Sequence, residues 1–374
     1  MAIMRPAGDF DRTYEQDMAV LRQRWQYVLL ILFIIALFTL PYYASESTVS
    51  LVNRICIFII AVQGLNILTG YTGQISLGQA AFMTVGGYIS ALLVGVLGWN
   101  FFLALPAASL GAGVVGLLFG LPSLRVKGFY LAMATLSAQF IIPWVTRNLW
   151  PDVLNGAQGI NVPVPAIKLP VIARQCFLGT TFDQELAACT YRFATPAQMI
   201  HITLVVLLIT TVIALNISRS RLGRAFISIR DNDLAAELLG INLFHYKLRA
   251  FFLASVYAGI AGSLLAHNLR HINSETLNLS DSILLLGMLV IGGLGTNVGP
   301  IFGTMLIILL EEFATVISPT IIALMPSNAS GVAAALRPLI FGFALALFLI
   351  FEPRGLAHRW SLIKAAWRLR PFAR

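Results

Sequence analysis

A glycine motif is the first feature of this sequence that could do chemistry. Gly111, Gly113 and Gly116 formally match the G-x-G-x-x-G fingerprint of dinucleotide-binding proteins. That fingerprint works between a strand and the start of a helix, whereas here it lies inside an apolar block with no strand before it. We therefore interpret Gly116, together with Gly120, as a small-residue face for helix packing.

Histidine and phosphate-loop chemistry give no better candidates. His267 and His271 stand four residues apart, but no carboxylate motif accompanies them, and we interpret them as polar surface. The sequence contains no Gly-Lys-Ser/Thr phosphate loop, so this chain is not expected to hydrolyse ATP. We expect no catalytic residue, no metal site and no cofactor bound by this chain.

A polar, glycine-rich segment between two apolar blocks is the best candidate for a binding role. Residues 70–79 read GYTGQISLGQ. Irregular backbone at membrane depth is tolerated only where protein covers it or water lines it, and broken helices recur at transport sites. We predict a helix break that lines a solute pathway or gate, with Gly73, Gln74, Ser76 and Gln79 as its candidate residues. The alternative is an interfacial loop packed tightly through its glycines.

A second glycine cluster follows later in the chain. Residues 292–300 read GGLGTNVGP, and Gly303 comes shortly after. We interpret this cluster as a hinge between two apolar blocks, and its candidate pathway or gate residues are Gly292, Gly293 and Gly295.

Composition identifies the elements that must position these segments. Of the 374 residues, 58% are apolar and only 11% are charged, against about 25% charged in an ordinary soluble domain. The apolar residues fall in blocks of about twenty, the length that a helix needs to cross a bilayer. The charges lie between these blocks and in the tails rather than on one face, so the net charge of +9 does not indicate nucleic acid.

We predict an all-α integral membrane protein with about ten transmembrane helices. The expected spans are 27–43, 51–69, 77–97, 101–121, 128–145, 197–216, 248–268, 281–298, 300–317 and 337–351. The chain divides into a cytoplasmic amphipathic stub (1–26), a transmembrane domain (27–353) and a basic cytoplasmic tail (354–374). The transmembrane domain includes an outer loop (146–196) and a cytoplasmic loop (217–247). The stub carries acids as well as arginines, which does not fit a cleaved signal peptide.

The positions of Lys and Arg predict the orientation. With ten alternating spans and a cytoplasmic N-terminus, the cytoplasmic segments hold eighteen Lys and Arg residues and the outer segments hold six. This bias follows the positive-inside rule, so both termini are expected in the cytoplasm.

The two halves of the chain then run in opposite directions, and we predict that they form a 5+5 inverted repeat. A short sequence echo favours it, because 75–80 (ISLGQA) resembles 277–282 (LNLSDS), and each stretch opens the third span of its half. Chance similarity in an apolar chain is the alternative.

The cytoplasmic loop contains a segment with complete helix signals. Asp231 or Asn232 is suited to cap a helix, Asp233 favours its positive end, and Gly240 is suited to close it. We predict a short helix with Ala235 and Ala236 exposed. Such a helix either docks in a groove of another protein or lies on the bilayer.

The three cysteines are too few for a disulfide scaffold. Cys56 lies in an apolar block and is interpreted as a small buried hydrophobe. Cys176 and Cys189 share the outer loop and are a candidate disulfide.

At these residues the chain resembles the LivM-type permease subunits of branched-chain amino acid ABC importers. The resemblance covers 66–353 and is carried by the segments 70–82, 128–136, 223–225, 230–240, 246–248, 292–295 with 299–300, and 351–356. The family usually has a histidine where this chain has Gln79.

The resemblance implies a fold, partners and a location. It implies that the cytoplasmic helix is the coupling helix that docks on a cytoplasmic ATPase, and its residues are Arg230, Asp231, Asn232, Ala235, Ala236, Glu237 and Gly240. It further implies a second permease subunit of the LivH type, two ATPase subunits that bind ATP and Mg, a periplasmic solute-binding protein, and a multi-pass location in a bacterial inner membrane.

Two alternatives to the import of branched-chain or related amino acids remain open. Related permeases move urea or short amides. An autonomous secondary transporter would instead need ionisable residues near the membrane midplane, and Arg54, Glu311 and Glu312 lie away from it.

Overall fold

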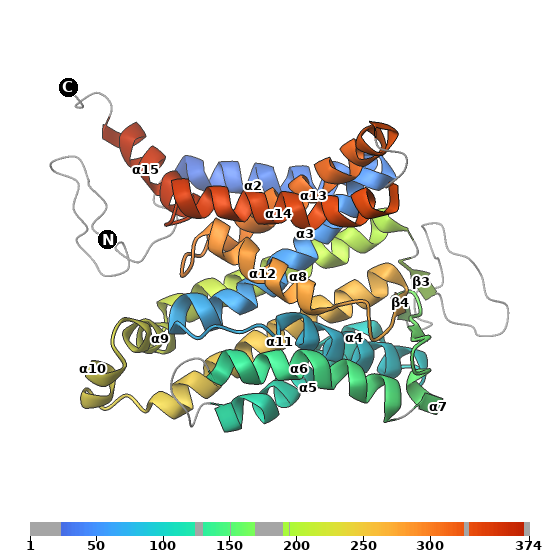
Figure 1. Ribbon diagram of the computed structural model, residues 1–374, viewed down its shortest axis with the longest axis horizontal. Coiled ribbons are helices and arrows are strands. Elements are labelled where there is room, and N and C mark those ends of the chain that lie inside the picture. Colours follow the sequence, from blue (N-terminus) through green and yellow to red (C-terminus); the bar gives the residue numbers. More distant parts are fainter. Residues whose placement is uncertain are drawn as a thin grey trace. The chain divides into compact units, whose positions relative to one another are not determined.

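The computed structural model describes residues 24–123, 130–149, 151–168, 190–193, 195–324 and 329–369. The chain forms two compact units: Ser45–Leu286, and a second unit made of Met1–Ala44 with Gly287–Arg374. Most of the described elements are helices (Figure 1).

The helices of the first unit follow the expected apolar blocks. They are α3 (Glu46–Leu65), α4 (Gln79–Gly95), α5 (Phe101–Ser123), α6 (Tyr130–Asn148), α7 (Pro151–Leu154), α8 (Pro196–Arg219), α9 (Arg221–Asp231), α10 (Asp233–Leu238) and α11 (Leu243–Leu269). The short strands are β1 (Ile160–Asn161), β2 (Ala166–Lys168), β3 (Thr190–Arg192) and β4 (His271–Ile272). Helix α12 (Leu279–Gly292) begins in this unit and ends in the other.

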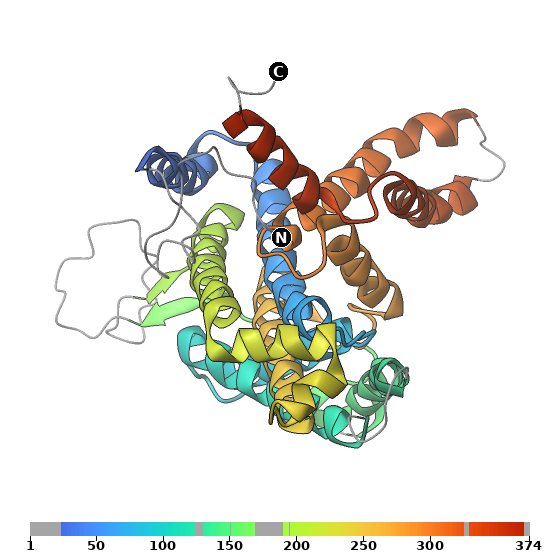
Figure 2. The same ribbon diagram turned by 90° about the vertical axis from the view of Figure 1, so that its left-hand side faces the viewer.

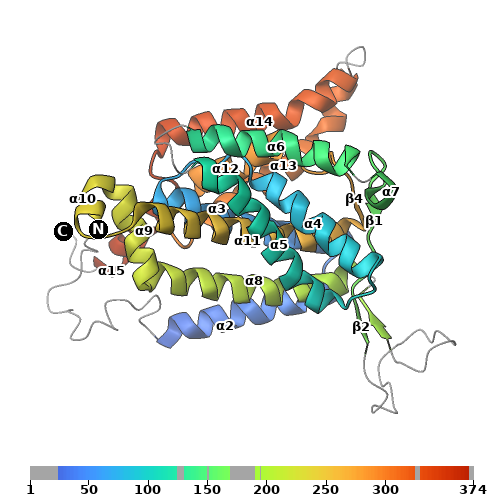
Figure 3. The same cartoon turned by 90° about the horizontal axis from the view of Figure 1, so that it is seen from below.

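Helix α11 is the centre of the first unit and packs against α3, α4 and α5 (Figure 3). Glycines let the backbones of α4 and α11 touch: a Cβ on Gly86 would overlap the backbone of Gly259, and one on Gly262 would overlap the carbonyl of Met83. Such small-residue contacts drive helix association in membranes, where there is little hydrophobic gain.

The G-x-G-x-x-G motif belongs to the same packing. It lies on α5, where a Cβ on Gly116 would overlap the side chain of Ser255, and one on Gly120 would meet the ring of Phe251 at 3.0 Å. Ser255 and Phe251 both lie on α11, which confirms the prediction of a helix-packing face.

The two ends of the first unit carry different elements. Helices α9 and α10 lie at one end, and α7 with the strands lies at the other (Figures 1 and 3). Figure 2 looks at the α9–α10 end, where these helices lie across the ends of the longer ones. At the strand end β1 pairs antiparallel with β4, and β2 with β3.

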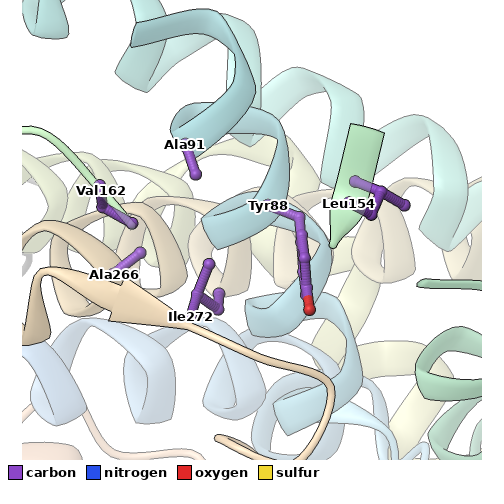
Figure 4. Packing of buried hydrophobic residues seen from close by; sticks show 6 residues of the cluster. All are labelled: Tyr88, Ala91, Leu154, Val162, Ala266 and Ile272. Carbon is purple, nitrogen blue, oxygen red and sulfur yellow. The ribbon is translucent and has the colours of Figure 1, made fainter. Parts of the chain in front are cut away.

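The strand end is closed by a small apolar cluster, drawn in Figure 4. It joins α4, α7, α11, β4 and the residue after β1 through the buried side chains of Tyr88, Ala91, Leu154, Val162, Ala266 and Ile272. His267 lies beside this cluster and is only 2% exposed. Its Nδ1 is 2.9 Å from the Pro163 carbonyl, and its Nε2 is 3.0 Å from the Ser90 hydroxyl. The prediction that His267 is polar surface is therefore wrong, because its buried ring joins the loop at Pro163 to the helices.

The second unit contains α2 (Arg24–Thr39), a 3₁₀ turn (Leu40–Tyr42), α13 (Gly299–Leu324), α14 (Ala329–Phe351) and α15 (Leu356–Leu369). Helices α13 and α14 pack against each other. Between α14 and α15 the chain bends by 45°, at a turn where Gly355 has a φ of +77° that favours glycine.

Each of the ten expected spans overlaps a helix. Not every one of these helices is long and apolar enough to cross a membrane by itself. In the described part of the chain, five helical stretches are long and apolar enough to cross a membrane: Glu46–Tyr71, Phe101–Leu121, Pro196–Arg219, Leu243–Leu269 and Gly299–Thr320. The bent pair Pro338–Phe351 and Leu356–Lys364 gives a sixth if it is counted as one span. Val28–Tyr42, Gln79–Gly95 and Leu279–Gly292 are shorter apolar helices.

Candidate functional site

The predicted helix break between α3 and α4 is present. Helix α3 passes into a π-helical turn, Asn66–Tyr71, and regular helix resumes only at Gln79. Gly73 has a φ of +72°, which turns the chain out of the helix. The backbone N–H of Gln74 and the hydroxyl of Thr72 both donate to the Leu68 carbonyl. The segment is therefore an ordered, non-helical stretch.

The polar side chains of the break are buried, and they differ in their partners. Gln74 is 8% exposed, and within the described structure neither its Nε2 nor its Oε1 has a hydrogen-bond partner. The Ser76 hydroxyl accepts a 3.4 Å hydrogen bond from the N–H of Gly78. Gln79 donates from Nε2 to the carbonyls of Ala61, at 3.0 Å, and Ala254, at 3.3 Å. Gln79 thus joins α3, α4 and α11, whereas the Gln74 amide is the one left to bind something else.

The start of α4 is held by two side chains that sequence reasoning missed. The N–H of Ala80 donates to the Ser282 hydroxyl, and the N–H of Ala81 donates to Gln139 Oε1, both at 3.0 Å. The Ser282 hydroxyl also donates to Gln139 Oε1 at 3.0 Å. These bonds satisfy two N–H groups that a helix leaves without intrahelical partners. In the sequence, Gln139 is a single amide between apolar neighbours, and Ser282 ends the polar stretch 278–282. Neither position indicates its distant partner.

The second glycine cluster forms a tight turn between α12 and α13. Gly293 and Gly295 have φ values of +113° and +71°. A Cβ on Gly292 would overlap the carbonyl of Gly299. The Thr296 hydroxyl donates to the Gly293 carbonyl at 2.8 Å and accepts from the N–H of Gly299 at 3.0 Å. The position between two helices matches the predicted hinge.

The loop between α8 and α11 contains the predicted short helix, α10. Asn232 caps it, because its side chain accepts a 3.1 Å hydrogen bond from the N–H of Ala235. Gly240 follows the helix with a φ of +83°. Lys247 pairs with Asp233 at 2.8 Å and so fastens α10 to the start of α11.

The face that α10 presents differs from the predicted one. Ala235 is exposed as predicted, but Ala236 is 1% exposed and faces the protein. The prediction of an exposed Ala236 is wrong because this position faces back toward the chain. The exposed apolar surface is supplied instead by Leu234, Leu238 and Leu239, which are 65%, 89% and 80% exposed. We call these three residues the leucine face.

The remaining candidates lie at different places. Asp231 and Glu237 are exposed beside the leucine face. Cys56 is buried with a free thiol, whereas Cys176 and Cys189 fall outside the described residues. In the described ranges, no group of three His, Cys, Asp or Glu side chains is placed to hold a metal ion.

Several helices long and apolar enough to cross a membrane, with a buried polar break between two of the helices, indicate a multi-pass membrane protein. The chain belongs to the family described as branched-chain amino acid transport system / permease component, which matches residues 47–349. No solved structure matches the chain significantly.

Curated relatives agree with this family. The chain is 30% identical over 289 residues to the high-affinity branched-chain amino acid transport system permease protein LivM of Escherichia coli (strain K12), which covers 75% of this chain and 68% of that protein. The LivM protein of Salmonella typhimurium (strain LT2) is 29% identical over the same shares. The autoinducer 2 import system permease protein LsrC of Yersinia enterocolitica is 29% identical over 107 residues, which are 27% of this chain and 30% of that protein.

Proposed function

We propose that this chain is the transmembrane permease subunit of an ATP-driven importer for branched-chain or related amino acids. The observation that carries the proposal is the leucine face of α10. Two leucines of the six-residue capped helix and Leu239, directly after it, are exposed, outside every candidate span. Exposed apolar clusters mark sites that meet another protein or a membrane, and we propose the former here.

The proposed occupant of the leucine face is a cytoplasmic ATPase subunit. Family membership supports this choice, because the relatives are permease components of transport systems. The proposed coupling residues on and beside this helix are Arg230, Asp231, Asn232, Ala235, Glu237 and Gly240. The buried side chain of Ala236 packs the helix against the rest of the chain. In this proposal ATP and Mg bind to the partner subunits, and this chain binds no cofactor.

The proposed pathway for the solute runs past the break between α3 and α4. Gln74 supports this proposal most directly, since a buried amide without partners costs about 1–3 kcal/mol unless something binds it. A passing solute or the water of the pathway would supply that partner. We include Gly73, Ser76 and Gln79 in the wall of the pathway, and Gly292, Gly293 and Gly295 in a second hinge.

The proposed topology has ten spans, with both termini in the cytoplasm of a bacterial cell and the chain in its inner membrane. The opposite placement of the α9–α10 loop and the outer-loop strands supports it (Figure 3). An inverted repeat is supported by the meeting of the two echo segments, which end at Ala80 and Ser282 and are joined there by a hydrogen bond. Both α4 and α12 are short, and each starts after non-helical chain.

The complete importer would contain a second permease subunit of the LivH type, two ATPase subunits and a periplasmic solute-binding protein. The binding protein would select the solute. We propose that Cys176 and Cys189 form a disulfide in the outer loop that faces it.

The test is to express the tagged chain with the second permease, ATPase and binding-protein genes encoded beside it, and to purify it in mild detergent. The proposal predicts that both ATPases co-purify and that unlabelled leucine competes with labelled leucine for uptake. Competition by urea, without competition by leucine, would replace the amino-acid assignment with an amide one. Failure of any ATPase to co-purify would contradict the proposal.

A further inference from the structure

We propose that Arg230 is a positioning residue that joins the α9–α10 helices to the break after α3, so that movement of α10 is transmitted to the solute pathway. This inference rests on the proposed function. It gives Arg230, whose side chain is 37% exposed, a contact within the permease instead of a docking contact with the ATPase.

A hydrogen bond makes the first connection. Arg230 Nη1 donates to the Gly70 carbonyl at 2.8 Å, across 160 residues of sequence. Gly70 lies at the end of the π-helical turn, where carbonyl groups lack partners within the helix. The helix end also carries a partial negative charge, so a guanidinium is well suited to satisfy it.

Gly73 makes the second connection. A Cβ at this position would lie 3.1 Å from Cγ and 3.7 Å from Cβ of Arg230. The residue has a φ of +72°, so its backbone turns directly over the arginine side chain. Arg230 therefore contacts the break at two points, one polar and one steric.

The other side of Arg230 is continuous with α10. It lies in the last turn of α9, two residues before the Asn232 cap of α10. Its guanidinium also bonds the carboxylate of Asp231 at 3.2 Å. Because only Asp231 separates Arg230 from the Asn232 cap, a displacement of α10 must move Arg230 with it.

The first test compares Arg230→Gln and Arg230→Lys with Arg224→Gln in the full complex. Arg224 is the matched control: it lies on the same helix, and its Nη1 donates to the Arg219 carbonyl at 3.0 Å. The measurements are bound ATPase, ATP hydrolysis and uptake of labelled L-leucine in vesicles with the binding protein.

We expect Arg230→Gln to keep both ATPases bound and hydrolysing, while uptake per ATP falls about tenfold, the effect of one lost hydrogen bond from a charged donor. Arg230→Lys keeps a charged donor and should restore most of the uptake. Arg224→Gln should transport as the unmodified chain does. Loss of ATPase binding in Arg230→Gln would make Arg230 a docking residue, and unchanged uptake would give it no role; either result overturns the inference. If the unmodified complex binds no ATPase, the proposed function fails instead.

The second test remains decisive even if Arg230→Gln folds poorly. Cysteines replace Gly73 and Arg230 in a chain whose native cysteines are substituted by alanine or serine. The 3.7 Å between the Cβ positions lies within the range of about 3.5–4.5 Å for disulfides. We expect oxidation to form the cross-link and to raise uptake per ATP over the reduced form, because the covalent bond replaces the lost contact. Oxidation should not change the Gly73→Cys single variant. A cross-linked form that transports no better than the reduced form, or no cross-link at all, overturns the inference.

Discussion

Replacing Leu238 with alanine should weaken ATPase binding without destabilising the permease. The side chain is 89% exposed, so nearly all of it is available to a partner and little of it stabilises the chain. Leu→Ala removes three carbon atoms, worth about 0.8 kcal/mol for each methylene that would be buried. The expected loss is about 2 kcal/mol, or roughly 30-fold in the dissociation constant.

The assay titrates purified ATPase onto the permease complex in nanodiscs and follows thermal unfolding of the same samples. Leu118→Ala is the matched control, because Leu118 is 63% exposed on the span of α5 and should affect neither measurement. Ala236→Glu should behave oppositely to Leu238→Ala: it buries an unpaired charge under α10, which costs several kcal/mol, and should lower the stability of the loop. Unchanged ATPase affinity in Leu238→Ala, or a clear drop in its thermal stability, would refute the reasoning.

Three further predictions concern the topology, the disulfide and the pathway. In intact cells, single cysteines introduced at Lys168 and Arg224 should react with an impermeant thiol reagent only at 168; the reverse pattern would contradict the ten-span topology. Mass spectrometry of non-reduced peptides should find Cys176 joined to Cys189, a bond that should stabilise the folded chain by about 3 kcal/mol. Two unmodified thiols would rule the bridge out. Gln74→Leu should keep the thermal stability, because it replaces two unpaired buried polar atoms, while it lowers leucine uptake; normal uptake would remove Gln74 from the pathway.

The lengths of the apolar blocks and the capping residues were sufficient to predict the long apolar helices and α10, but not α7, α9 or α15. The ends of α5 and α8 fall within a few residues of the expected spans, because a run of about twenty apolar residues between charges has few other solutions. Asn232 and Gly240 also predicted the ends of α10 correctly, because a helix cap depends only on residues close to it in the sequence.

Features that depend on distant contacts were not predictable. Ala236 was expected on the surface because a six-residue helix is too short for its apolar face to be read from periodicity. The π-helical turn at Asn66–Tyr71 leaves no compositional mark. The bond from Arg230 to the Gly70 carbonyl joins two segments 160 residues apart, and in the sequence Arg230 is simply one of several loop arginines. Gln74 was recognised as a polar residue in an apolar region, but its lack of partners is a property of the folded chain.

The most direct test of the proposed function is to measure which energy source drives uptake. The full complex, reconstituted in vesicles with its binding protein, should accumulate labelled L-leucine only when ATP is present on the side of the ATPases. Uptake should continue when ionophores collapse the ion gradients. Uptake that persists without ATP and stops with the ionophores would show an ion-driven transporter, and it would contradict the assignment of this chain as the permease of an ATP-driven importer.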